Sequence, residues 1–324
     1  MSSLSAFSPR GALPARFRRQ RLLIVGCGDV GLRVARSLTT GPGAQRVRVL
    51  ALTSEPARVA PWRALGLTPL VGDLDHAATL RRLAGLATRV LHLAPPPPAG
   101  AGPDGWWRDP RTQALARALR RRTKPAVLVY GSTSGVYGDC GGDWVSETRP
   151  VAPATARAQR RVDAERAVRH LGRAGVRTSI LRIPGIYAPD REGGTPEARL
   201  RKGTPVLAAP DDVYTNHIHA DDLARACTAA LWRGAAQRVY HVCDDTDLKM
   251  GDYFDLAADL YGLPRPPRVS RSAAPAQLPV LQLSFMSESR RLDNTRMRHE
   301  LRLRLRYPTV AQGLRVPAAI TKTL

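Results

Sequence analysis

A short apolar run followed by a glycine-rich turn, RLLIVGCGDVGLRVARSL over residues 21–38, constrains the fold of this chain more than any other stretch. The run over 22–25 has the length of a buried strand, and the apolar residues after the turn recur at helical spacing. The turn fits G-x-G-x-x-G, so strand, turn and helix follow one another as this motif requires. Its glycines permit a tight turn and close approach of a pyrophosphate, whose charge the helix N-terminus attracts. This pattern predicts a dinucleotide site at Gly26, Gly28, Asp29, Val30 and Gly31; a purely structural turn is the alternative.

The end of the second predicted strand, 46–52, bears on the type of dinucleotide. In NAD-binding folds an acidic residue usually closes this strand and binds the ribose 2′-hydroxyl. Here Thr53 and Ser54 follow the strand and Arg58 comes just beyond, and hydroxyls with a guanidinium suit a 2′-phosphate. The pattern favours NADP over NAD. Glu55 as the ribose-binding acid, and a merely solvated Arg58, stay open as alternatives.

Strands and helices alternate as far as residue 184. We expect further strands over 67–71, 89–94, 126–130 and 178–183, and helices over 75–86, 112–122 and 153–170. This alternation is typical of an α/β fold with a doubly wound parallel sheet, a Rossmann fold, in which ligands bind at the carboxyl ends of the strands. Residues that follow these strands are therefore predicted to border the cofactor: Asp73, Leu74, Ala94, Pro95 and Pro184.

A hydroxyl-rich segment, GSTSGVYG over residues 131–138, follows the fifth predicted strand. In an open α/β sheet the carboxyl end of a central strand is a place where ligands bind. We therefore expect Thr133 and its neighbours at the substrate site. A hydroxyl-rich turn without a functional role is the alternative.

The chain carries a formal net charge of +23, which raises the question of a nucleic-acid partner. Its 50 basic residues include only four Lys, and the Arg residues are spread along the whole chain. Zinc-finger spacing and a basic strand studded with aromatic residues are both absent from the sequence. We expect a small-molecule substrate, with nucleic-acid binding the less favoured alternative.

Composition also bears on the cellular location of the protein. The sequence has no run of eighteen apolar residues, so we expect no membrane span. Residues 1–20 are basic without an apolar segment, and we expect a flexible tail there instead of a secretory signal. The four Cys lack C-x-x-C spacing and are expected to be free thiols of a cytoplasmic protein. Cys27 beside the helix N-terminus could have a lowered pKa, or could simply be a small residue that fits the turn.

His217 and His219 are two residues apart on a strand predicted over 213–219 and precede Asp221 and Asp222. Residues with this spacing point to the same face of a strand, so the pattern is compatible with a metal site. The alternative, which we prefer, is a strand that leads into a helix with an acidic residue near its start. We therefore expect no metal.

Eight segments in order resemble the extended short-chain dehydrogenases/reductases of the NAD-dependent epimerase/dehydratase type. They are GCGDVG at Gly26, GDLD at Gly72, VLHLAP at Val90, STSGVYGD at Ser132, WVSETRPVAP at Trp144, ILRIPGIYAP at Ile180, HADDLA at His219 and RRLDN at Arg290. The resemblance implies a Rossmann domain over 21–187, to which 214–243 return, and a smaller substrate domain over 188–213 and 244–324. It also allows a homodimer.

The chain departs from this family at the catalytic pair. Members use Tyr-x-x-x-Lys on the helix after the fifth strand, and these positions fall on Arg157 and Arg161. Arg161 can still bind the nicotinamide ribose, but a guanidinium with a pKa above about 12 cannot replace the phenol as a proton donor. The family's active-site hydroxyl maps to Thr133, and Tyr137 or Tyr187 could supply the missing acid.

Two functions follow from the resemblance and from this departure. The first, which we favour, is an NAD(P)-dependent oxidoreductase or epimerase-like enzyme, with Thr133, Tyr137 and Arg161 as candidate catalytic residues and a carbonyl or hydroxyl compound, such as a sugar nucleotide or an aldehyde, as substrate. The second is a sensor or regulatory protein that binds a dinucleotide with little or no turnover. The missing Tyr-x-x-x-Lys pair is what separates them.

Overall fold

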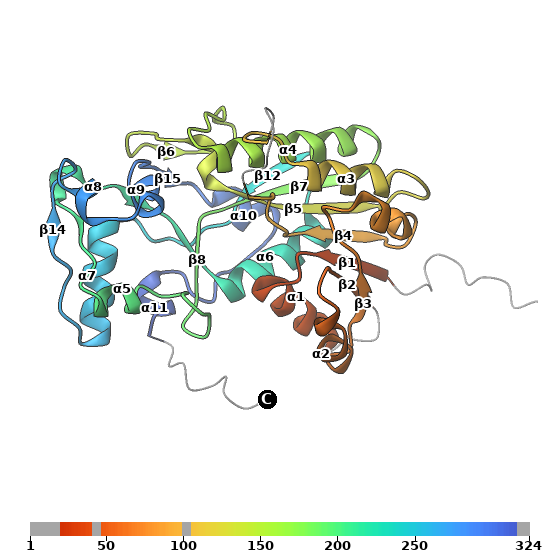
Figure 1. Cartoon of the computed structure of the whole chain (residues 1–324), viewed down its shortest axis with the longest axis horizontal. Coiled ribbons are helices and arrows are strands. Elements are labelled where there is room, and N and C mark those ends of the chain that lie inside the picture. The colour runs from red at the N-terminus through yellow and green to blue at the C-terminus, as the bar shows by residue number, and fades with distance from the viewer. Residues whose placement is uncertain (1–19, 41–46, 99–104, 316–324) are drawn as a thin grey trace, which may run out of the picture.

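The computed structural model of the chain describes residues 20–40, 47–98 and 105–315 (Figure 1). The predicted basic tail over 1–20 lies outside these ranges, except for Gln20, which begins the first strand. The described residues form a larger part built on one sheet and a smaller part beside it (Figure 1).

A seven-stranded parallel sheet forms the centre of the larger part. Its strands, in the order β12-β7-β5-β4-β1-β2-β3, are β12 (Arg238–His241), β7 (Arg177–Ile183), β5 (Val127–Thr133), β4 (Arg89–His92), β1 (Gln20–Val25), β2 (Val47–Thr53) and β3 (Thr68–Val71). The chain order reverses between β1 and β4, which is the switch point where ligands bind in such sheets. The predicted doubly wound fold is confirmed.

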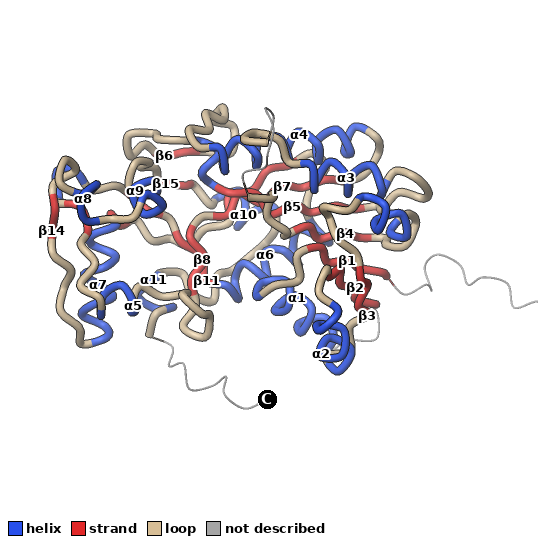
Figure 2. The backbone as a smooth tube through the Cα atoms, viewed as in Figure 1, coloured by secondary structure: helices blue, strands red, loops and turns tan. Residues whose placement is uncertain are grey.

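Helices cover both faces of this sheet (Figures 1 and 2). One face carries α1 (Asp29–Thr39), α2 (Val59–Ala64), α6 (Ala220–Arg233) and α10 (Thr295–Glu300). The other carries α3 (Pro110–Leu119), α4 (Ala156–Arg173) and a 3₁₀ helix over Ala77–Leu83. Strands covered on both sides are apolar along their length, which explains the run from Leu22 to Val25, fully buried in the structure.

The smaller part has a core of its own, around Tyr253 and Phe254. Its helices are α5 (Glu197–Arg201), α7 (Met250–Tyr261), α8 (Ala274–Gln277), α9 (Val280–Phe285) and α11 (Val310–Gly313). Its short strands pair as β9 (Val206–Leu207) with β14 (Arg268–Val269) and β10 (Tyr214–Thr215) with β13 (Leu248–Lys249). Two further pairs, β8 (Gly185–Tyr187) with β11 (His217–His219) and β6 (Trp144–Val145) with β15 (Arg291–Leu292), join segments far apart in the sequence.

Two predicted elements differ in the structure. The helix expected over 75–86 is the shorter 3₁₀ helix Ala77–Leu83. The strand expected over 213–219 is divided into β10 and β11, which have different partners. Asn216 lies between them and uses its side chain to bind the backbone of Arg290 and Leu292, so the chain turns here from one pairing to the other.

The predicted substrate domain over 244–324 needs a correction. Helix α10 packs against β12, and Met297, Leu301 and Leu303 belong to the core beneath the sheet. Residues 295–303 therefore complete the larger part, although most of the smaller part precedes them in sequence. Across the described ranges, every helix is too short or too polar to cross a membrane.

Candidate functional site

At two glycines of the turn after β1, the absence of a side chain allows close packing against neighbouring backbone atoms. Gly26 has φ +86°, and a Cβ there would lie 2.2 Å from the backbone nitrogen of Ala94, so both conformation and space exclude a side chain. A Cβ at Gly31 would lie 3.0 Å from the carbonyl oxygen of Gly26, and its absence lets α1 approach β1. These are the packing roles that the motif requires.

Gly28 faces open space instead. Apart from Gly28 and its two chain neighbours, no heavy atom of the described residues lies within 4 Å of the position that its Cβ would take. Gly28 is the N-cap of α1, no side chain in the described part of the chain caps this helix end, and its φ of −83° is accessible to any residue. The first N–H groups of α1 are therefore free for an anion, and the space over Gly28 fits a pyrophosphate.

A cleft of about 300 Å³ lies along the carboxyl ends of β1, β5 and β7. It brings together eight predicted residues: Gly26, Gly28, Asp29, Val30, Gly31, Thr133, Arg161 and Pro184. Gly131 and Ser132 of the predicted hydroxyl-rich segment also line it, and the sequence analysis missed five others: Leu93, Ile183, Ile186, Arg191 and Leu223. Leu93, Ile183 and Ile186 are close neighbours of predicted residues, whereas Arg191 and Leu223 come from a loop and a helix that no local pattern linked to the turn. We call this space the cofactor cleft.

The residues predicted to distinguish NADP from NAD lie outside the lining of the cofactor cleft. Thr53 is buried, and its Oγ1 accepts a hydrogen bond from the backbone of Glu55 at 3.0 Å. Arg58 is paired with Glu55, with 2.8 Å between Nε and Oε2. Ser54 is exposed. The pairing leaves Glu55 less available as a ribose-binding acid, and Arg58 keeps further N–H donors on its guanidinium.

Asp73, Leu74, Ala94 and Pro95 also lie outside the lining. Oδ1 of Asp73 accepts a hydrogen bond from the backbone of Asp75, and Leu74 packs against the core on the α3 face of the sheet. Ala94 adjoins the turn, since its backbone nitrogen faces the missing Cβ of Gly26. Ala94 therefore packs directly against the turn at Gly26.

Cys27 serves packing in the turn. Burial raises the pKa of its thiol to about 12, against a smaller opposing effect of the Arg58 charge. The proposal of a lowered pKa at the helix N-terminus is therefore wrong. All four Cys are buried and free, as predicted.

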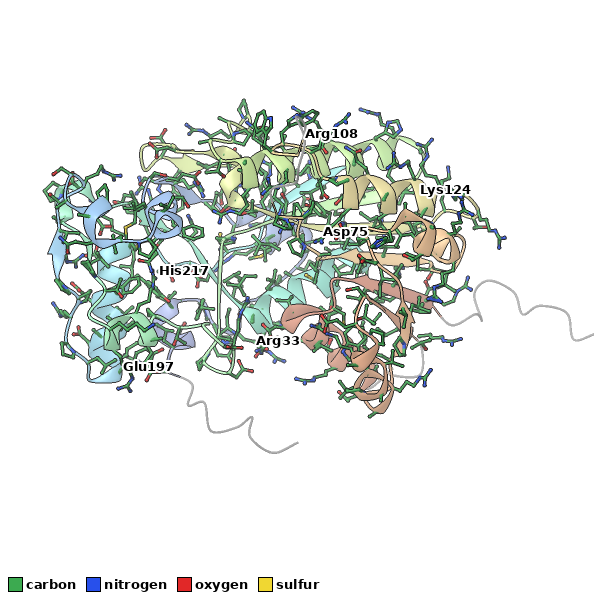
Figure 3. The ribbon with its side chains drawn as sticks, in the orientation of Figure 1. Arg33, Asp75, Arg108, Lys124, Glu197 and His217 are labelled. Atoms are coloured by element: carbon green, nitrogen blue, oxygen red, sulfur yellow. The ribbon has the colours of Figure 1, made fainter. Side chains whose placement is uncertain are left out.

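A second cleft, of about 570 Å³, opens between the sheet and the smaller part and shares Thr133, Pro184 and Ile186 with the first. We call it the substrate cleft. Its lining includes the aromatic residues Tyr187, Tyr214, Tyr253 and Phe285, the cations Arg157, Arg199 and Arg290, and one carboxylate, Glu288. His217 lies on the side formed by the smaller part (Figure 3). The two clefts meet at Thr133, so groups bound in each can approach one another there.

A carboxylate lies near the hydroxyl at this junction. Thr133 Oγ1 accepts a hydrogen bond from the backbone of Gly135 at 3.2 Å. A Cβ at Gly135 would lie 3.6 Å from Thr133 Oγ1 and 3.9 Å from Glu288 Oε2, so the missing side chain leaves both groups beside one small space. Glu288 also pairs with Arg290 at 2.9 Å. The sequence analysis missed Glu288 because it is far from Thr133 in the chain and belongs to no motif.

Residues 22–243 match the model of the NAD dependent epimerase/dehydratase family. The chain belongs to this family. The match spans the strands of the sheet, the glycine turn and Thr133. None of the curated proteins is similar enough to match the chain.

Solved structures resemble this epimerase/dehydratase family member over most of its length. A conserved protein of unknown function from Silicibacter pomeroyi is 31% identical, with a TM-score of 0.70 over 91% of this chain and 96% of that one. The dTDP-glucose 4,6-dehydratase of Streptomyces venezuelae, solved with NAD, is 23% identical (TM-score 0.71, 91% and 95% covered). The UDP-glucuronic acid 4-epimerase of Bacillus cereus, solved in complex with NAD, is 18% identical (TM-score 0.69, 92% and 97% covered). The last two show the fold alone.

The two arginines predicted to stand at the positions of the family's Tyr and Lys line different clefts. Arg161 lines the cofactor cleft, where its Nη1 donates to the carbonyl oxygen of Gly131 at 2.8 Å and to the hydroxyl of Tyr130 at 3.1 Å. Arg157 lines the substrate cleft, with its guanidinium 4.6 Å from the ring of Phe285. Arg161 is therefore placed to bind a cofactor, and Arg157 to attract an anionic substrate.

Tyr137 lies outside both clefts. Its side chain is 1% exposed, and its hydroxyl lies 2.6 Å from Arg182 Nη1 and 2.5 Å from His241 Nε2. Burial raises the pKa of Tyr137 to about 12. The structure therefore corrects the catalytic role predicted for Tyr137: its phenol completes a buried hydrogen-bond network and is out of reach of a substrate.

A Tyr137→Phe variant is expected to be less stable but to bind the dinucleotide as the wild type does. Losing the hydroxyl leaves Arg182 and His241 each without one buried partner, which costs about 1–3 kcal/mol. Urea unfolding and NADH fluorescence titration measure the two properties. Weakened NADH binding at unchanged stability would restore Tyr137 to the site.

Tyr187 and the two histidines form an aromatic cluster. Tyr187 lines the substrate cleft, but its hydroxyl donates to the carbonyl oxygen of Thr309 and packs against α11. His217 stacks on Tyr253 at 4.2 Å, and burial lowers its pKa to about 4, so it is neutral at pH 7. His219 caps α6 by accepting from the backbone of Asp221. Within the described ranges, no three His, Cys, Asp or Glu side chains are grouped as a metal site would need.

Proposed function

We propose that this chain is an NAD(P)-dependent oxidoreductase or epimerase-like enzyme that acts on a carbonyl or hydroxyl group of a small molecule. The observation that carries the proposal is the junction of the cofactor cleft and the substrate cleft at Thr133. Hydride transfer requires the two reactants in van der Waals contact, and a shared hydroxyl at the contact can hold the substrate oxygen.

The residues of the cofactor cleft fit a dinucleotide. The open space over Gly28, with uncapped N–H groups of α1 beside it, would hold the pyrophosphate. Arg161 is held by the carbonyl oxygen of Gly131 and would bind the hydroxyls of the nicotinamide ribose. The bound dinucleotide would supply or accept the hydride.

Glu288 is our candidate for the proton transfer that the family assigns to its tyrosine. When a hydroxyl is oxidised, its carbon loses a hydride and its oxygen loses a proton. Thr133 would hydrogen-bond the substrate oxygen, and the Glu288 carboxylate would take the proton; in the reverse direction it would return it. Arg290, paired with Glu288, would keep the carboxylate in place.

We further propose that the enzyme prefers NADP to NAD. Thr53 closes β2 where NAD-specific folds carry an acid, and the nearest carboxylate, Glu55, is engaged by Arg58. Exposed Ser54 and the remaining donors of Arg58 would meet the 2′-phosphate.

The lining of the substrate cleft supports an anionic substrate with a flat ring, such as a sugar nucleotide. Arg199 stacks on Phe254 at 4.2 Å, and Arg157 stacks on Phe285. Two of the similar structures are of sugar-nucleotide enzymes, a dTDP-glucose 4,6-dehydratase and a UDP-glucuronic acid 4-epimerase, which agrees with this substrate class.

The second candidate is a dinucleotide-binding sensor with little or no turnover. It is favoured by one observation: neither of the two phenols predicted to replace the family's tyrosine is free to do so, since Tyr137 is buried in a network and the Tyr187 hydroxyl faces α11. A sensor would keep the cofactor cleft and lose hydride transfer.

Turnover assays distinguish the two functions. The full chain is incubated with NADPH or NADH and a panel of aldehydes and ketones, and absorbance is followed at 340 nm. It is also incubated with NADP or NAD and UDP-glucose or dTDP-glucose, and the sugar products are separated by chromatography, because an epimerase or dehydratase returns the hydride to the sugar and leaves the absorbance at 340 nm unchanged. We expect turnover, and a loss of about a hundredfold or more in kcat for Glu288→Gln with similar cofactor affinity. Glu197→Gln, a carboxylate of α5 paired with Arg201 outside both clefts, is the control. Cofactor binding without any turnover would favour the sensor.

A further inference from the structure

One cation of the cofactor cleft, Arg191, comes from the segment that follows β8 and not from the glycine turn. Arg191 lines this cleft together with Gly28 and Asp29. Its Nη1 lies 3.7 Å from Asp29 Oδ2, too far for a hydrogen bond. Both atoms are buried, and neither has a hydrogen-bond partner among the described residues. A buried guanidinium nitrogen without an acceptor is costly, so its place beside the N-terminus of α1 calls for an explanation.

Asp29 does not need Arg191 as its counter-ion. Its other carboxylate oxygen accepts a hydrogen bond from Arg33 Nε at 2.9 Å. Arg33 is the centre of an ion-pair cluster with Asp29, Asp190 and Asp221, and it is only 13% exposed (Figure 3). Asp29 thus already has an ion-pair partner, and the Nη1 of Arg191 donates no hydrogen bond among the described residues.

The segment that carries Arg191 is held firmly. Its backbone closes on itself through hydrogen bonds from Ala188 N to Gly194 O at 3.2 Å and from Gly194 N to Arg191 O at 2.9 Å. The neighbouring Asp190 binds Arg33 of α1 through both carboxylate oxygens, at 2.7 and 2.8 Å. These contacts fix the segment against the helix whose N-terminus faces the cleft, so Arg191 is preorganised.

We propose that Arg191 binds the pyrophosphate of the dinucleotide and clamps it against the turn at Gly28. This assignment rests on the proposed function, because it assumes that a dinucleotide occupies the cofactor cleft. A phosphate oxygen would accept the hydrogen bond that Nη1 now lacks, and the guanidinium would offset the repulsion between the phosphates and Asp29. The glycine turn supplies backbone N–H groups to the pyrophosphate. Here the Arg191 side chain, from the segment after β8, would add a positive charge.

Binding of ADP and adenosine to the full chain tests this inference by isothermal titration calorimetry. ADP carries the pyrophosphate and adenosine does not. For Arg191→Ala we expect ADP and NADH to bind about ten- to a hundredfold more weakly, and adenosine to bind as to the wild type. The salt dependence of ADP affinity should also become shallower. Arg201→Ala, an exposed arginine of α5 paired with Glu197, is the control and should change neither ligand. Arg191→Lys should recover part of the ADP affinity.

Three outcomes would contradict the role of Arg191 or the proposed function. Equal ADP affinity in the wild type and in Arg191→Ala, with both folded by circular dichroism, would overturn the role of Arg191 and leave the proposed function intact. Equal losses for ADP and adenosine would also overturn it, because the effect would then be a disturbed cleft. Failure of the wild type to bind either ADP or NADH would overturn the proposed function itself.

Discussion

Replacing Gly28 with valine is expected to weaken NADH binding by about a hundredfold or more and to leave the fold intact. The valine side chain would occupy the open space over the turn, where the pyrophosphate would otherwise lie. Apart from residues 27–29, no atom of the described residues lies within 4 Å of the new Cβ, and the φ of Gly28 is accessible to any residue, so the free energy of unfolding should change by less than about 0.5 kcal/mol. Overlap with a bound ligand costs several kcal/mol, and each 1.4 kcal/mol is about tenfold in affinity.

The other glycines of the turn provide the control. Gly28→Ala should give a smaller loss of NADH affinity than Gly28→Val. Gly26→Ala should instead destabilise the fold, by about 3 kcal/mol or more, because its Cβ would collide with Ala94 and its φ is +86°. NADH fluorescence titration and urea unfolding separate these effects. Unchanged NADH affinity in Gly28→Val would mean that no pyrophosphate passes over the turn.

The second large effect is expected at the buried pair of Glu165 and Arg182. Their side chains are 4% and 3% exposed, and Arg182 Nη2 lies 2.8 Å from Glu165 Oε2. Glu165 also accepts from Ser132 Oγ at 2.7 Å. Glu165→Ala would leave a buried guanidinium without its carboxylate, and we expect the free energy of unfolding to fall by about 3–5 kcal/mol.

A double variant tests whether the uncompensated charge causes that loss. Glu165→Leu with Arg182→Met removes both charges and keeps apolar volume, so we expect it to recover at least half of the stability lost by Glu165→Ala, as measured by urea unfolding. A double variant as unstable as the single one would mean that packing and the bonds to Ser132 and Tyr137, not charge, dominate.

The glycine turn was predictable from sequence because its determinants are local. A buried strand, glycines at fixed spacing and an amphipathic helix follow one another within residues 21–38, and the contacts of Gly31 with Gly26 and Ile24 join residues of that same stretch. The parallel sheet was predictable for a similar reason, since each strand is an apolar run between helical segments.

The predictions that were wrong or missing concern residues that are placed by contacts between distant segments of the chain. Tyr137 follows a strand end, as a cleft residue should, but β12 places His241 against its hydroxyl, and this pairing joins residues 104 positions apart. Helix α10 lies within the range predicted as the substrate domain, yet it packs on β12. Glu288 and Arg191 enter the clefts from loops that distant segments hold in place, through the contacts of Ser289 with Asp139 and of Asp190 with Arg33. No periodicity or spacing encodes such placements.

The central claim is that the cofactor cleft binds a dinucleotide for hydride transfer, and titration of the full wild-type chain with NADPH and NADH by isothermal calorimetry tests it most directly. The account predicts saturable binding of one dinucleotide per chain, tighter for NADPH, and lost in Gly28→Val. Tighter binding of NADH would reverse only the preference inferred from Thr53 and Arg58. Absence of saturable binding by both nucleotides would contradict the claim.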